Sequence, residues 1–115
     1  MTALPSDVEL LALPDIAVLL DLPITRVHQL LRDGELVAVA RDGGPRAVPA
    51  AFVADGVVVK GLPGVIRLLR DARYEDGEIV DWLFRPDESL PGTPIQALRE
   101  NRGTEIKRRA QAAGF

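Results

Sequence analysis

Residues 13–49 read LPDIAVLLDLPITRVHQLLRDGELVAVARDGGPRAVP, and this stretch decides the fold. Apolar residues recur at helical spacing on both sides of the turn Asp21-Leu22-Pro23, which predicts a short first helix that starts at Pro14 and a second helix over residues 24–33. Pro14 suits the first turn of the first helix, where its missing N–H would have no partner. Gly34 favours the left-handed conformation that ends the second helix, and two short strands are expected to follow, over residues 36–41 and 47–49. The stretch is therefore predicted to form two packed helices and a β-hairpin.

The second predicted helix has an apolar face and a polar face. The apolar positions expected to face the core are Ile24, Val27, Leu30 and Leu31. The polar positions are Thr25, Arg26, His28, Gln29 and Arg32. Their hydroxyl, imidazole, amide and guanidinium groups are those with which a helix reads base edges and contacts phosphates in a DNA major groove. An ordinary solvent-exposed face is the alternative, and the hairpin that follows favours DNA binding.

The predicted hairpin carries two arginines at a glycine-rich turn. Gly43 and Gly44 form the tip, and Arg41 and Arg46 flank it, so the arginines are expected to project on either side. Arginines in this place can contact phosphates or enter a minor groove. A hairpin whose arginines only solubilise its ends fits the pattern equally well.

The composition argues against several kinds of site. The chain has no cysteine and one histidine, which excludes a disulfide scaffold and argues against a structural zinc centre. It lacks the glycine-rich phosphate loop, the dinucleotide-binding glycine pattern and the nucleophile elbow of hydrolases. We therefore expect no enzymatic activity, catalytic residue, metal or cofactor. The acidic N-terminus and the absence of a membrane-length apolar run predict a cytoplasmic protein that does not bind membranes. Association with the nucleoid is expected if the protein binds DNA.

The net charge of −3 by itself argues against nucleic-acid binding, but its distribution does not. Residues 1–21 hold four acidic and no basic side chains, whereas residues 22–74 hold eight basic and five acidic ones. Residues 75–115 hold six basic and eight acidic side chains. The positive segment coincides with the second helix and the hairpin, so we expect modest DNA affinity, or affinity raised by dimerisation.

Residues 61–115 are predicted to be helical. Asp76 is expected to cap one helix, and Thr93 and Gln96 form a capping box ahead of another. Trp82, the largest apolar side chain, is expected at the junction between this half and the first.

Three arginines of this half, Arg67, Arg70 and Arg73, allow two interpretations. They could extend a phosphate-contacting surface. Pairing with Asp71 on a solvated helix face is the favoured interpretation.

The sequence resembles known DNA-binding families. The stretch from residue 13 to residue 49 is similar to the winged helix-turn-helix of MerR- and excisionase-type regulators. Extended through VVVKGLPGVIRLLRDARYEDGEIVDWLF and IQALRENRGTEIKRRAQAAGF, the chain resembles a small actinobacterial family known from a mycobacterial DNA-binding substrate of a Ser/Thr protein kinase. The segments LVAV, VVVK-LPG and WLF-PD are the most specific. Asp21 and Pro23 depart from the glycine and serine usual in the helix-turn-helix turn.

The resemblance implies a mainly α fold with a small β-hairpin or sheet, in which a winged helix-turn-helix is followed by a C-terminal helical subdomain. We expect a short N-terminal lead over residues 1–12, the winged helix-turn-helix over residues 13–60 and the helical subdomain over residues 61–115. These parts would pack into a single compact unit.

The expected function is sequence-specific or semi-specific binding of double-stranded DNA by a transcription regulator or nucleoid-associated factor. The helix at residues 24–33 would enter the major groove, and the wing at residues 41–46 would contact the backbone or minor groove. The residues expected to contact DNA are Thr25, Arg26, His28, Gln29, Arg32, Arg41, Gly43, Gly44 and Arg46. A homodimer on paired half-sites is left open. The alternative is an antitoxin-like or other module whose C-terminal helices bind a protein partner, because the tail WLFRPDESLPGTPIQALRENRGTEIKRRAQ is similar to the partner-binding end of antitoxins.

Overall fold

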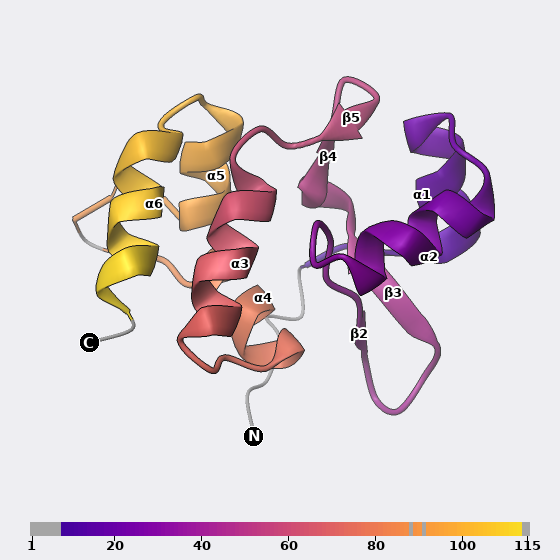
Figure 1. The fold of residues 1–115 in the computed structure, drawn as a ribbon, viewed down its shortest axis with the longest axis horizontal. Helices are drawn as coiled ribbons and strands as arrows, with labels where there is room; N and C mark the ends of the chain where they lie inside the picture. The colour runs from indigo at the N-terminus through magenta and orange to yellow at the C-terminus, as the bar shows by residue number, and fades with distance from the viewer. Residues whose placement is uncertain (1–7, 88, 91, 114–115) are drawn as a thin grey trace.

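The computed structural model describes residues 8–87, 89–90 and 92–113, which form two neighbouring groups of elements (Figure 1). One group holds helices α1 and α2 with the short strands, and the other holds helices α3 to α6, which confirms the predicted fold class. Predictions that concern residues 1–7 lie outside the described residues. In chain order the elements are β1 (Leu10–Ala12), α1 (Leu13–Leu20), α2 (Ile24–Arg32), β2 (Val39–Ala40), β3 (Arg46–Pro49), the 3-10 helix η1 (Ala50–Phe52), β4 (Val53–Ala54), β5 (Val57–Val58), α3 (Leu62–Asp71), α4 (Asp76–Phe84), α5 (Pro94–Arg99) and α6 (Gly103–Ala112).

Both helices of the helix-turn-helix end at a residue in the left-handed conformation. Asp21 has a φ of 54°. Its N–H donates to the Val18 carbonyl (3.1 Å), and the Leu22 N–H donates to the Ala17 carbonyl (3.0 Å), which closes the end of α1. Gly34, with a φ of 75°, ends α2 in the same way, as predicted. Aspartate is one of the few residues that tolerate this conformation, so the turn forms without the usual glycine.

Strand β3 lies between β1 and β2 in a three-stranded antiparallel sheet. Strand β1 pairs Leu10 with Pro49 and Ala12 with Ala47. The sequence indicates only a lead here, because three residues are too few to show strand alternation. The strand predicted near residues 36–41 is shorter than expected: β2 is two residues long, and residues 36–38 are buried in the core.

The C-terminal group is built around α3, which packs against α6 and α4. The capping box of Thr93 and Gln96 at the start of α5 is confirmed. The predicted cap at Asp76 is wrong. Glu75 is the N-cap of α4, and its N–H donates to Oε1 of Glu78 at 3.0 Å, which completes a capping box one residue earlier.

Phe52 joins the two groups in one hydrophobic core. It ends the 3-10 helix η1, is fully buried, and stacks on Phe84 of α4 with ring centroids 5.9 Å apart. The prediction that Trp82 anchors this junction is wrong, because Trp82 is only half-buried and lines a surface hollow within the C-terminal group.

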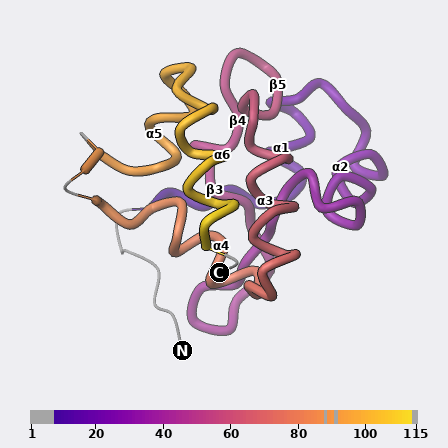
Figure 2. The backbone as a smooth tube through the Cα atoms, turned by 60° about the vertical axis from the view of Figure 1, so that its left-hand side comes forward, coloured from indigo at the N-terminus to yellow at the C-terminus, as the bar shows by residue number. Residues whose placement is uncertain are grey.

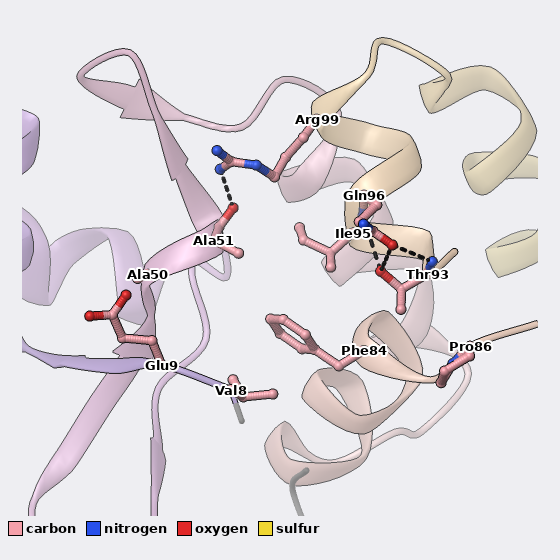
Figure 3. Close-up of a pocket in the computed structure, with 10 residues that line it drawn as sticks. All are labelled: Val8, Glu9, Ala50, Ala51, Phe84, Pro86, Thr93, Ile95, Gln96 and Arg99. Carbon is pink, nitrogen blue, oxygen red and sulfur yellow. Dashed lines mark hydrogen bonds between the residues drawn. The ribbon is translucent and has the colours of Figure 1, made fainter. Parts of the chain in front are cut away.

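Arg99 of α5 adds a polar connection between the two groups. Its Nη1 donates to the carbonyl oxygens of Ala51 (2.8 Å) and Val53 (2.9 Å). Arg99, Val8 and Phe84 line a groove of about 760 Å³. Figure 3 shows the Arg99 guanidinium at the edge of this groove. The helix-turn-helix is thus attached to the C-terminal helices by both apolar packing and hydrogen bonds.

Candidate nucleic-acid interface

The outer face of α2 carries the five polar side chains that the sequence predicts there. All of them are exposed: Thr25, Arg26, His28, Gln29 and Arg32. The opposite face buries Val27, Leu30 and Leu31. Ile24 is an exception to the predicted core stripe, because 39% of it is exposed at the start of the helix.

Two of these side chains are held together. Nη1 of Arg26 donates to Oε1 of Gln29 at 2.5 Å, across one turn of the helix. Because both residues are exposed, the remaining N–H groups of Arg26 and the amide N–H₂ of Gln29 are accessible donors, and such groups can bond to guanine, adenine or phosphate. The face can therefore read nucleic acid chemically.

The start of α2 also favours anions. Pro23 precedes the helix without a side-chain cap, and the first turn holds no acidic residue. The first N–H groups of a helix have no partner within it and lie at the positive end of its dipole. This end can receive a phosphate oxygen without a competing carboxylate from the first turn.

The hairpin between β2 and β3 projects away from the helices in both views (Figures 1 and 2). Asp42 (φ 55°) and Gly43 (φ 73°) are both left-handed, and the Gly44 N–H donates to the Arg41 carbonyl at 2.9 Å. This is a tight Asp-Gly turn of the type that matches strand twist. A Cβ on Gly44 would lie 3.1 Å from the Arg41 carbonyl oxygen, so both glycines shape the tip. Arg46 is exposed at its base.

Arg41 does not project as predicted. It is half-buried, and its Nη2 donates to the Val8 carbonyl at 2.9 Å. The guanidinium therefore ties the hairpin to the segment that precedes β1. Arg41 therefore positions the wing.

A hollow of about 310 Å³ links α2 to the base of the wing and to the C-terminal helices. It is lined by His28, Leu31, Arg32, Arg46, Arg70 and Asp76. The sequence allows Arg70 as one of three arginines that could extend a phosphate-contacting surface, but the favoured interpretation pairs it with Asp71. That pairing is wrong: Nη2 of Arg70 bonds to Oδ1 of Asp76 at 3.0 Å.

The other two arginines of this group lie outside the hollow. Arg67 is exposed on α3, and Arg73 follows α3 in the left-handed conformation with a φ of 70°. Over the described ranges, no cluster of three or more His, Cys, Asp or Glu side chains could hold a metal. In the same part of the chain, no helix has the length and apolar character needed to cross a membrane.

The chain matches two protein-family models and a relative from Mycobacterium tuberculosis. The model described as "DNA-binding protein Rv2175c, wHTH domain" matches residues 1–53, and that described as "Rv2175c C-terminal domain of unknown function" matches residues 59–114. The DNA-binding protein Rv2175c of that organism is 43% identical over 115 aligned residues, which cover 90% of this chain and 79% of the relative. The NMR structure of Rv2175c matches with a TM-score of 0.88 at 39% identity, covering 100% of this chain and 87% of that chain. These matches confirm the family resemblance.

Proposed function

We propose, from the premise that the chain belongs to the winged helix-turn-helix family of the DNA-binding protein Rv2175c, that it binds double-stranded DNA. Helix α2 would lie in the major groove, with the β2–β3 wing on the adjacent backbone or minor groove. The protein would act by occupying DNA, as a transcription regulator or nucleoid-associated factor, and not by catalysis.

The observation that carries this proposal is the outer face of α2, where every predicted contact residue is exposed. The contacts proposed from α2 are Thr25, Arg26, His28, Gln29 and Arg32. The wing would add Arg46 and the backbone around Gly43 and Gly44. Arg41 would act indirectly, because it fixes the hairpin to the N-terminal segment.

The test is fluorescence anisotropy of a labelled duplex of mixed sequence, titrated at several salt concentrations. We expect the affinity to fall linearly with salt on a log–log plot, with a slope of about −0.9 for each phosphate contacted. Arg26→Ala and Arg32→Ala should each weaken binding. A variant that has lost a phosphate contact should also lower the slope by about 0.9, whereas one that has lost only a base contact should not.

Arg108→Ala is the matched control, since Arg108 is an exposed arginine of α6 outside the hollow. It changes the net charge equally and should leave the affinity almost unchanged. If the wild-type protein binds no duplex at low salt, the proposal is wrong. If Arg108→Ala weakens binding as much as Arg26→Ala, the attraction is a property of net charge and not of α2.

The alternative of a partner-binding module on the C-terminal helices has little support from the described surface. Large hydrophobic side chains that are strongly exposed lie only in the N-terminal group among the described residues: Val18, Leu19, Ile24 and Val57. An interface core is usually apolar and aromatic, and the aromatic side chains that the C-terminal group presents to a surface hollow in the described ranges, Tyr74 and Trp82, are only partly exposed. A homodimer on paired half-sites stays a prediction, which sedimentation with and without DNA can test.

A further inference from the structure

The hollow beside α2 gathers positive side chains from both groups of the fold. Arg32 comes from the last turn of α2, Arg46 from the start of β3, and Arg70 from the last turn of α3, with His28 beside them. Arg70 reaches the end of α2, because its Nη1 lies 4.0 Å from the position a Cβ would take on Gly34. Two of these arginines belong to the proposed DNA-binding surface, whereas the third belongs to α3.

The charge in the hollow is only partly neutralised. Asp76 is the one carboxylate among the described residues that line it, and it pairs with Arg70. No carboxylate of the described residues pairs with Arg32 or Arg46. Like charges that share a small space repel one another, and an anion bound between them would relieve that repulsion.

The pair between Arg70 and Asp76 can open at little cost. The two side chains are 37% and 44% exposed, and exposed ion pairs contribute little to stability because water screens them. A guanidinium carries five N–H donors in a planar fork, so rotation of the Arg70 side chain alone can direct donors toward a phosphate, with no change in α3.

We propose that this hollow seats a phosphate of the DNA backbone, held by Arg32 and Arg46 from the winged helix-turn-helix and by Arg70 from the C-terminal helices. The proposal rests on the function proposed above, since it needs α2 to lie on DNA. It assigns to residues 61–115 a direct part in DNA binding, beyond support of the core. Asp76 would limit the affinity, because its carboxylate competes with the phosphate for Arg70.

The test measures DNA affinity and its salt dependence for Arg70→Gln and Asp76→Asn, with Arg108→Gln as the control of equal charge change. Loss of one phosphate contact should weaken binding about eightfold at 0.1 M salt and lower the slope by about 0.9. We expect this of Arg70→Gln, whereas Arg70→Lys, which keeps the charge, should retain most of the slope. Asp76→Asn should tighten binding severalfold, and Arg108→Gln should change neither quantity.

The outcomes separate this proposal from the function on which it rests. If the wild-type protein binds no DNA, both are overturned. If the wild-type binds and Arg26→Ala weakens it, but Arg70→Gln behaves like Arg108→Gln, only the phosphate seat is overturned. If Asp76→Asn weakens binding as much as Arg70→Gln does, while both variants melt at the wild-type temperature, the pair acts only to position the helices, and the seat is again overturned.

Discussion

Phe52→Ala is the sharpest test of how the two halves of this chain hold together. Phe52 is the largest of the fully buried side chains among the described residues, and its ring stacks on Phe84 at 5.9 Å with an interplanar angle of 24°. It belongs to the segment that follows the wing, whereas Phe84 ends α4 in the C-terminal group. Removal of the ring would therefore leave a cavity at the only aromatic contact found between the described parts of the two halves.

The expected loss of stability is large. Truncation of a buried phenylalanine to alanine costs about 3–5 kcal/mol, which combines lost transfer free energy with the cost of the cavity. Domains of this size are typically stable by only about 5–15 kcal/mol. An unfolding entropy of about 2.1 cal/mol/K per residue amounts to about 240 cal/mol/K for 115 residues. The melting temperature should therefore fall by about 12–20 °C.

Differential scanning calorimetry measures this directly, and it also reports the number of transitions. We expect one transition for the wild-type protein and one, at lower temperature, for Phe52→Ala, because a single core spans both halves. Val57→Ala is the control, since Val57 is 61% exposed and its truncation should shift the melting temperature by less than about 2 °C. A drop of only a few degrees for Phe52→Ala, or two separate transitions in the wild-type, would refute the conclusion that this ring couples the halves.

Three further predictions follow from helix ends and one carboxylate. Glu75→Ala removes the N-cap of α4 and should lower the free energy of unfolding by about 1 kcal/mol in urea titration; an unchanged midpoint would contradict the capping box. Arg73→Gly should raise that free energy by about 0.5–1 kcal/mol. The left-handed conformation costs a non-glycine residue about 1–2 kcal/mol, and part of this gain is offset because glycine loses more conformational entropy on folding. A destabilised variant would show that the contacts of the Arg73 side chain contribute more than the strain costs. The Ser89 N–H and hydroxyl, with Arg109, lower the pKa of Asp87, so the contribution of Asp87 to stability is present above its ordinary pKa and is lost as the pH falls through the lowered one. Ser89→Ala keeps the backbone N–H but removes the hydroxyl, so it should raise the pKa of Asp87 part of the way toward its ordinary value in a carbon-13 NMR titration of the carboxyl group. An identical titration in the variant would exclude the Ser89 hydroxyl as a cause.

The features that the sequence predicts well are those that depend only on residues close together in the chain. The turn between α1 and α2, the end of α2 at Gly34 and the capping box at Thr93 depend on residues within one helical turn, and each is found in the structure. The polar face of α2 is equally local, because a spacing of three and four residues places side chains on one side of any helix. Helix order and the proposed reading face follow from such signals.

The missed features depend on contacts between distant segments. Strand β1 forms because Leu10–Ala12 meets β3 across more than thirty residues, and no short-range pattern encodes that pairing. The stacking of Phe52 on Phe84 is non-local in the same way. Side-chain size alone therefore predicts Trp82, and not Phe52, at the junction between the two halves. Arg41 fails as a projecting wing residue for a related reason, since its partner is the carbonyl of Val8.

Arg70 pairs with Asp76 and not with Asp71 because of the backbone conformation of one residue, Arg73. Asp71 is adjacent in sequence, but consecutive residues of a helix do not face each other, so an ion pair between them is disfavoured by geometry alone. Arg73 takes the left-handed conformation, and the N–H of Tyr74 donates back to the Leu69 carbonyl at 3.0 Å, which reverses the chain after α3. The reversal returns the first residue of α4, Asp76, to the last turn of α3. Arg70 is consequently held beside the end of α2 and the base of the wing. In this place its guanidinium is a candidate contact to DNA and not only a solvated charge on α3.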